Sequence, residues 1–246
     1  MIKKSLVFIG AFLFGFSDFY TYTIKMNYKE YSSGRVLDKD YTDFGDLIGI
    51  GYKFEKFEGR YSYFLKTEFA YGSSYYKGAT WGGKPLSTKQ EDVYIINFEG
   101  GLGLRYFNFI LGYREWNRGK SNNPGDYNEK YYWPYFGIRY RYEFYFEKLA
   151  FLPEISYQNA ISPKIKVELG NQPVLDLGET SGMKVEIPFV FRKDNLYFKV
   201  FYRYQYWHIN RSDSGLLRIN GKVYEIYEPE SETINQYLGA GILWKF

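Results

Sequence analysis

Cysteine is absent from this chain of 246 residues, and histidine occurs once, as His208. Without cysteine the chain forms no disulfide, has no thiolate nucleophile and carries no cysteine-linked lipid anchor. A Ser–His–acid triad could be built only on His208, and no nucleophile elbow accompanies it. Cysteine chemistry is therefore excluded, and histidine chemistry is reduced to one position.

Long apolar runs are also missing, apart from Ser5 to Phe16. This run follows Lys3 and Lys4 and is shorter than the ~20 residues of a membrane-spanning helix. Small residues at Gly15 and Ser17 stand where a signal peptidase requires them. We predict a signal peptide over 1–17, cleavage before Asp18, and one mature domain over 18–246. Any membrane insertion of that domain must use strands.

The chain also has only a small excess of charge of one sign. The net charge of +4 falls to +2 once Lys3 and Lys4 are removed, so no global field favours nucleic acid. Aromatic residues are abundant instead, at 23% of the chain with 29 Tyr. Tyr and Trp gather where an apolar phase meets water, although Tyr-rich strands also occur in carbohydrate-binding surfaces.

Alternation with a period of two residues recurs along the whole chain and predicts ten strands. Their expected ranges are 19–30, 44–55, 59–72, 91–106, 108–116, 131–146, 148–158, 182–192, 195–209 and 232–246. Short connections alternate strictly with long ones, which span 31–43, 73–90, 117–130, 159–181 and 210–231. Five hairpins with long tips, joined by tight turns, are typical of outer-membrane barrels.

The C-terminus carries the most specific motif. The alternation continues to the last residue, and Gly241, Trp244 and Phe246 form a Gly-x-x-aromatic-x-aromatic ending. This ending resembles the insertion signal of Gram-negative outer-membrane β-barrel proteins. The resemblance implies an all-β, ten-stranded antiparallel up-and-down transmembrane β-barrel with periplasmic termini and extracellular long loops. It implies outer-membrane lipid, lipopolysaccharide and the barrel assembly machinery as partners, no nucleic acid, and a monomer as the expected state.

The two faces of each strand predict which side chains contact lipid and which line the lumen. About 50 bulky side chains do not fit inside a ten-stranded barrel, so we assign the apolar faces to lipid. In the first strand this set is Tyr20, Tyr22, Ile24, Met26 and Tyr28. The opposite faces would line the lumen with a charge network: Lys25, Lys53, Lys66, Glu68, Glu99, Arg105, Arg114, Arg139, Arg141, Glu143, Glu154, Lys184, Glu186, Lys199 and Arg203. Glycines on the lumen face would leave room for the long Arg and Lys stems. Ten cations against five carboxylates allow a plugged lumen, which we favour, or a narrow anion-preferring pore.

Enzymatic alternatives depend on His208. Omptin proteases share the strand number but need an Asp–His pair, and no Asp stands two residues before His208. The spacing from His208 to Ser212 also departs from the His-x-Ser pair of outer-membrane lipid A deacylases. Parity places His208 on the lipid side, in the aromatic girdle. We therefore predict no catalytic residue and no enzyme, and keep an omptin-like protease or a lipid-modifying hydrolase as the alternative.

The loops offer two weaker signals. The carboxylates of the first loop, Asp38, Asp40, Asp43 and Asp46, lack the glycine that a calcium loop needs, so we predict no metal site and no cofactor. Basic residues near the loop bases are candidates for lipopolysaccharide phosphates: Arg118, Lys120, Arg211 and Arg218. The predicted function is a non-enzymatic barrel with a surface or envelope role through its loops, or a narrow passage for small anionic solutes.

The C-terminal motif gives a first test. Phe246→Asp should greatly reduce the amount of assembled barrel, because it removes the terminal aromatic of the closing strand and its insertion signal. Lys222→Asp, in the last long loop, should have little effect, since loop tips tolerate change. Heat-modifiable migration on gels measures assembly, and equal migration of both variants would contradict the prediction.

Overall fold

The computed structural model describes residues 13–79, 83–123, 126–193 and 196–245. These residues form strands and connections, with no helix among them. The strands are β1 (Leu13–Ser32), β2 (Arg35–Tyr41), β3 (Leu47–Glu58), β4 (Tyr61–Ala79), β5 (Pro85–Leu104), β6 (Phe107–Asn117), β7 (Glu129–Arg141), β8 (Phe144–Tyr145), β9 (Leu149–Phe151), β10 (Glu154–Ala160), β11 (Lys164–Val167), β12 (Val174–Asp176), β13 (Thr180–Lys193), β14 (Leu196–Ile209), β15 (Gly215–Ile219), β16 (Lys222–Ile226) and β17 (Glu230–Lys245).

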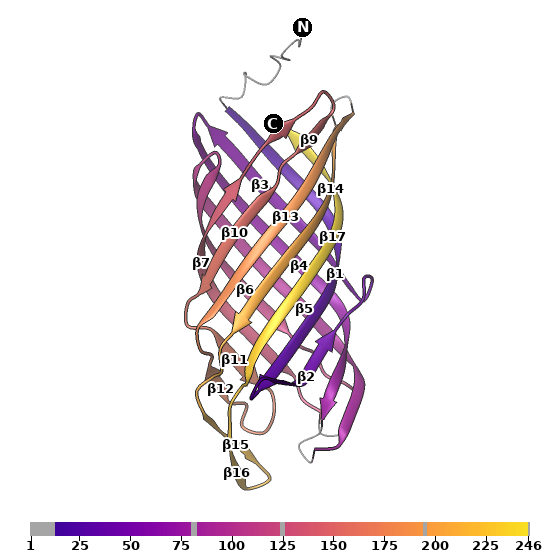
Figure 1. Ribbon diagram of the computed structural model, residues 1–246, viewed down its shortest axis with the longest axis vertical. Helices are drawn as coiled ribbons and strands as arrows, with labels where there is room; N and C mark the ends of the chain where they lie inside the picture. The colour runs from indigo at the N-terminus through magenta and orange to yellow at the C-terminus, as the bar shows by residue number, and fades with distance from the viewer. Residues whose placement is uncertain (1–12, 80–82, 124–125, 194–195, 246) are drawn as a thin grey trace.

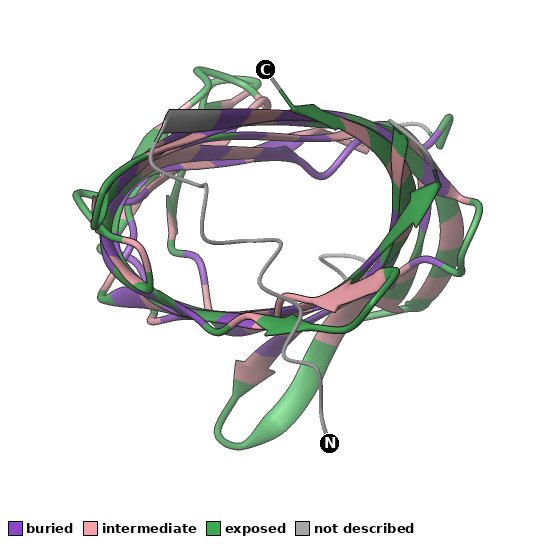
Figure 2. Ribbon diagram, turned by 90° about the horizontal axis from the view of Figure 1, so that it is seen from above, coloured by how far each residue is buried: buried purple, intermediate pink, exposed green. Residues whose placement is uncertain are grey.

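Ten of these strands pair in a closed antiparallel ring, in the order β1, β3, β4, β5, β6, β7, β10, β13, β14 and β17. β17 returns to β1, in a register that runs from Phe16 opposite Lys245 to Tyr31 opposite Glu230. Viewed along its long axis, the molecule is an oval ring of strands (Figure 2). The all-β, ten-stranded up-and-down barrel predicted from the alternation is confirmed.

The two ends of the barrel differ. Short connections join β3 to β4, β5 to β6 and β13 to β14 at the end where the C-terminus lies, which we call the turn end (Figure 1). At the opposite end, the loop end, paired strands continue past the ring. All five of the additional strands at this end lie within segments that the alternation predicts as long loops: β2, β11, β12, β15 and β16. The loops are therefore partly ordered extensions of the wall.

Two expected boundaries differ from the structure. The segment predicted as two long strands, 131–146 and 148–158, divides into four, and Pro153, which has no N–H for the ladder, accounts for the break between β9 and β10. β1 begins at Leu13, before the predicted cleavage site, so removal of residues 1–17 stays a prediction. Phe246 and residues 1–12 lie outside the described residues.

An apolar belt surrounds the ring. On β4 the outward residues run from Tyr61 to Tyr71, which at ~3.3 Å per residue and ~40° tilt spans about 25 Å, the height of an apolar barrel belt. A chain of aromatic contacts rims the belt at the turn end: Tyr106, Tyr142, Phe144, Phe151 and Phe189. At the loop end the belt stops near Tyr71 and Tyr94, which donate hydroxyl hydrogen bonds to Asp92 and Glu115.

The assignment of faces is wrong for β1 alone among the ring strands. Its five apolar side chains, Tyr20, Tyr22, Ile24, Met26 and Tyr28, are buried in the lumen. Lys25 points outward, where its ammonium lies 3.2 Å from the carboxylate of Asp43. Tyrosine explains the error, because its ring packs like an apolar group while its hydroxyl bonds with lumen charges. Tyr20, for example, donates to Glu68 at 2.7 Å.

Glycines on the neighbouring inward faces make room for these rings. A Cβ placed on Gly51 would lie 2.3 Å from Cζ of Tyr20, and one on Gly49 would lie 2.3 Å from Cζ of Tyr22. Similar contacts join Gly101 to Phe64, Gly112 to Tyr135, and Gly239 to Phe201. The expectation that lumen glycines leave space for Arg and Lys stems is wrong at these positions, because aromatic rings take that space.

Gly51→Ala should therefore destabilise the barrel by about 1–3 kcal/mol, because the Tyr20 ring is held by its bond to Glu68 and must move. The matched control is Gly100→Ala on the outer face, where the nearest atom to an added Cβ is 3.7 Å away. Its effect should stay within about 0.5 kcal/mol. Chemical unfolding of the refolded barrel measures both. In a Tyr20→Ala background, the free-energy cost of Gly51→Ala should largely disappear, and an unchanged cost there would contradict the explanation.

Candidate functional site

The lumen is crossed by ion pairs near the turn end. Arg139 on β7 reaches Glu55 on β3, with 2.8 Å between guanidinium and carboxylate. Arg141, two residues further along β7, holds the other oxygen of Glu55 at 2.7 Å and also reaches Glu143 at 3.0 Å. The Arg139 side chain is 1% exposed. These bonds join opposite walls, so they brace the ring across its interior.

A second ionic layer lies deeper in the barrel. Arg203 on β14 contacts Glu68 on β4 at 2.8 Å and Glu186 on β13 at 2.6 Å. Lys66 lies beside the same two carboxylates, at 3.3 and 3.7 Å. Each ammonium or guanidinium in this layer is buried against a carboxylate, as a closed, water-poor interior requires.

Most of the predicted network is thus brought together inside the barrel. All of its members except Lys25 line the lumen or its turn-end mouth. Two carboxylates that the sequence analysis missed also belong to it: Glu55, and Asp18, which pairs with Lys199. The count becomes nine cations and seven carboxylates, in place of ten and five. The basic excess behind the anion-pore hypothesis is therefore much smaller.

Arg114 is the lumen cation that has no carboxylate partner within ion-pair distance among the described residues. Its guanidinium donates to the side-chain oxygens of Asn97, at 3.1 Å, and Gln205, at 3.4 Å. Neutral amides therefore hold a buried charge at this level. The side chain is fully enclosed by the wall.

Little space remains in the middle of the lumen. The cavity between Lys66, Glu99 and Arg203 measures about 10 Å³, roughly the room for one water molecule. Towards the loop end the lumen is filled by buried aromatic rings. Trp133 packs on Trp207 with 5.1 Å between ring centroids, and Trp116 stacks on Tyr131 at 4.9 Å. Buried aromatic and charged side chains thus occupy the middle of the lumen and its part towards the loop end.

The turn-end mouth is open by contrast. A cavity of about 410 Å³ opens there, and its lining includes Phe57, Tyr145 and Leu243 together with charged groups. Its floor is the ionic layer that contains Glu55, Glu154 and Arg141. The cavity is a vestibule that ends at the ion pairs.

A cluster around Arg118, the residue that follows β6, lies at the loop-end mouth. Its guanidinium is buried and contacts three carboxylates: Glu30 on β1 at 2.9 Å, Asp40 on β2, and Glu129 on β7. Glu228 lies next to them and accepts hydrogen bonds from Tyr28 and Tyr131, at 2.9 and 2.5 Å. Four carboxylates surround one cation. Arg118 is therefore a structural centre rather than an outward ligand for lipopolysaccharide phosphates.

This cluster lies beyond the apolar belt, because the outward residues beside it on β1 and β17 are Lys29 and Glu232. Burial is the main cause that raises the pKa of Glu30 to about 7, against the lowering effect of Arg118, and neighbouring carboxylates add to the rise. Burial likewise raises the pKa of Asp40 to about 6. Burial and the charges of Glu30 and Glu129 raise the pKa of Glu228 well above its ordinary value.

His208 lies on the outer surface of β14, at the rim of the belt, as parity predicted. Its Nε2 is 2.9 Å from the side-chain oxygen of Asn210 and 3.8 Å from the carboxylate of Glu230. The first-loop carboxylates do not converge, since Asp40 faces the Arg118 cluster and Asp43 faces Lys25. Among the described residues no group of three or more acidic or histidine side chains is arranged to hold a metal ion.

The other basic candidates of the loops are scattered. Arg211 stacks its guanidinium 3.7 Å from the centre of the Tyr227 ring, and Lys120 and Arg218 are exposed on separate connections. In the part of the chain that the structure describes, no helix is long and apolar enough to cross a membrane.

A closed ring of ten antiparallel strands, an apolar belt with aromatic rims and a charged interior define the class of outer-membrane β-barrels. Among solved structures, the outer membrane protease OmpT of Escherichia coli is similar, with a TM-score of 0.58 and 13% identity over 96% of this chain and 97% of its own. The β domain of the Bordetella autotransporter BrkA covers 94% of this chain and 99% of its own, at 10% identity and a TM-score of 0.43. Neisserial surface protein A covers 93% and 97%, at 15% identity and a TM-score of 0.37.

No protein-family model matches the chain, and no curated protein sequence matches it. At identities of this size the likeness to OmpT is a likeness of fold. The chain therefore has the fold of outer-membrane β-barrel proteins, and no specific family is identified.

The Arg118 cluster predicts a pH dependence. A carboxyl whose pKa is higher in the folded state binds more protons there, so its contribution to stability is present at low pH and is lost as pH rises through the folded value. For Glu30 and Asp40 the window runs from about pH 4 to about pH 7. The folded loop end should be more stable at pH 5 than at pH 8.

Glu30→Gln should flatten this dependence and raise stability at pH 8, because the buried charge is removed while Asp40 and Glu129 still hold Arg118. Hydrogen exchange of the amides of β1 and β2 at the two pH values measures the local effect. Glu58→Gln, at a turn-end residue whose side chain is 49% exposed, is the matched control and should leave the dependence unchanged. An unaltered pH profile in Glu30→Gln would count against the cluster as its origin.

Proposed function

We propose that this protein is a non-enzymatic outer-membrane barrel with a closed lumen, which acts through its extracellular loop end. The observation that carries the proposal is the filled interior. Ion pairs link opposite walls through Arg139 and Arg203, and the cavity in the middle of the lumen has a volume of only about 10 Å³. Such a barrel serves as a rigid support, and its chemistry towards the surroundings lies on its outer wall and its loops.

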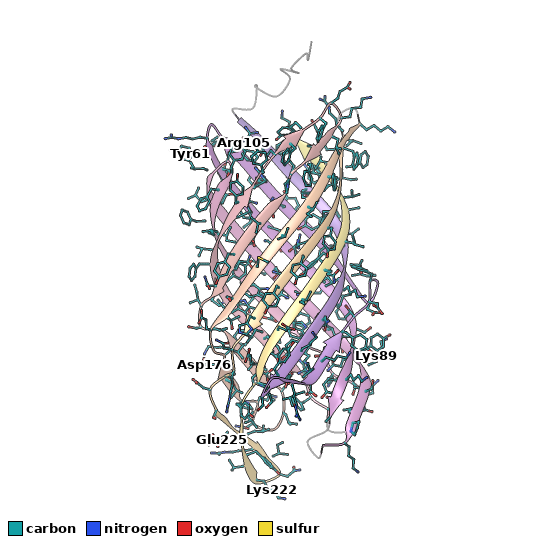
Figure 3. The ribbon with its side chains drawn as sticks, viewed as in Figure 1. Tyr61, Lys89, Arg105, Asp176, Lys222 and Glu225 are labelled. Carbon is teal, nitrogen blue, oxygen red and sulfur yellow. The ribbon has the colours of Figure 1, made fainter. Side chains whose placement is uncertain are left out.

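The orientation follows from the loop asymmetry. Short turns and the C-terminus would face the periplasm, and the extended strands with the β15–β16 hairpin would face the outside (Figures 1 and 3). The hairpin exposes Leu216 and Val223 next to charged residues such as Lys222 and Glu225. A surface or envelope role therefore fits better than passage of solutes, which was the other half of the predicted function.

The enzymatic alternative would need His208 to face an acidic partner in the mouth of the barrel. His208 lies on the outer face instead, next to Asn210 and Glu230. This position favours the non-enzymatic proposal. Peptide hydrolysis by the purified barrel that is lost in His208→Ala would favour a protease of the omptin type.

Conductance of the refolded barrel in a planar bilayer tests the closed lumen. We expect no steps of conductance from the unmodified protein or from Arg139→Gln. The variant should nevertheless lose about 3–5 kcal/mol of stability, because Glu55 and Glu154 keep buried charges without this partner. Arg60→Gln, at an exposed turn residue, is the control and should change neither measurement.

Steady conductance of the unmodified barrel would overturn the proposal. Anion preference in that case would revive the predicted passage for anionic solutes.

A further inference from the structure

Three lysines stand side by side on the outer wall, above the belt at the loop end. Lys29 on β1 is opposite Lys39 on β2, and Lys39 is opposite Lys77 on β4. Side chains directly opposite each other in antiparallel strands have Cβ atoms about 5 Å apart, and like charges at this distance destabilise a sheet. The register therefore places three lysine side chains in one row.

The row has little internal compensation. Lys29 is paired with Glu232, at 3.3 Å, at one end. Lys39 and Lys77 have no carboxylate within ion-pair distance among the described residues. The Lys39 ammonium lies instead 5.1 Å from the centre of the Tyr41 ring. An anion from outside the chain would relieve the repulsion.

A second row lies one step closer to the belt and adds an aromatic platform. Tyr41 is opposite Tyr75, and Tyr75 is opposite Lys89 on β5. The two tyrosine rings are stacked, with centroids 5.6 Å apart and planes at 27°. Lys89 lies on the outer side of the wall at the loop end, far from Tyr61 at the other end (Figure 3). Stacked rings next to ammonium groups suit a sugar that carries phosphate.

The height of the row above the belt indicates which class of lipid could supply that phosphate. Lys77 is six residues beyond Tyr71 on β4, which at ~3.3 Å per residue and ~40° tilt is about 15 Å. The headgroup layer of a phospholipid leaflet is only about 5–8 Å thick. A phosphate carried on sugars above the headgroup layer would reach the row, whereas phospholipid phosphates would stay below it.

We propose that Lys39, Lys77 and Lys89, with the Tyr41–Tyr75 platform, bind the phosphorylated sugars of lipopolysaccharide in the surrounding leaflet. The inference rests on the proposed function, because the loop end must lie in the outer leaflet. It replaces the loop candidates predicted from the sequence, of which Arg118 is buried, with residues on the lateral wall.

The test compares two variants of the refolded full barrel in detergent. The first is Lys39→Gln/Lys77→Gln/Lys89→Gln, and Lys29 is kept because it pairs with Glu232. The second is a control with the same charge change on other exposed loop-end residues, Lys120→Gln/Arg218→Gln/Lys222→Gln. Heat-modifiable migration establishes that each is folded. The probes are purified lipopolysaccharide, the same material after removal of its phosphates, phosphatidylglycerol, and soluble heparin.

We expect lipopolysaccharide to bind the first variant about tenfold more weakly than the unmodified barrel, and the control variant normally. Removal of the phosphates should weaken binding to the unmodified barrel to a similar extent, and phosphatidylglycerol should not distinguish the variants. Without lipopolysaccharide and at low salt, the first variant should melt about 2–4 °C higher than the unmodified barrel, because the repulsion is gone. If the three lysines had only a structural role, their replacement would lower the melting temperature instead.

Equal binding of phosphorylated lipopolysaccharide by all three proteins would overturn the proposal. The proposal would also be overturned if replacement of the three lysines weakened heparin binding more than lipopolysaccharide binding. That result would assign the row to a soluble polyanion. The closed lumen is tested separately by conductance. A barrel that conducts and still binds lipopolysaccharide through these lysines would refute the proposed function alone.

Discussion

Neutralisation of charge inside a closed ring is the constraint on which this molecule depends. The inward faces carry more lysine and arginine than a water-poor interior tolerates unless each group finds a partner. Glu55 and Glu68 meet this demand by accepting bonds from cations on distant strands. The same bonds cross the lumen, so the requirement that stabilises the interior also narrows it.

Tyrosine is the second part of this arrangement. On β1 it replaces charged side chains and packs over glycines of β3, while its hydroxyl groups reach the carboxylates. In an interior built from ion pairs and amphipathic rings, most hydroxyl and ammonium groups already bond to other side chains, so few of them need water. The open cavity lies in the turn-end vestibule, and the Arg118 cluster lies at the loop-end mouth.

The fold was predictable because alternation reports the two faces of a strand directly. The inward positions of Arg139, Lys184 and Arg203 followed from parity alone. β1 was not predictable in this way, since tyrosine is apolar enough for lipid and polar enough for a charged lumen. The Arg118 cluster could not be predicted from the sequence either. Glu30, Asp40 and Glu129 belong to three segments, which are brought together by strand extensions in the predicted loops. The lysine row depends on cross-strand register, which a single sequence does not give.

The ion pairs across the lumen have a consequence for how the chain assembles. Arg139, Lys184 and Arg203 lie in the second half of the sequence, and their partners Glu55, Glu99 and Glu68 lie in the first half. A half-built barrel would leave each of these charges only with partners from its own half of the chain, such as Lys66 for Glu68 and Glu186 for Arg203. Closure of β1 against β17 and completion of the interior must therefore occur together, which makes the last step of folding strongly cooperative. Intermediates that lack the final strands would keep part of their inward charge uncompensated, which would favour an open arrangement of the strands until the ring closes.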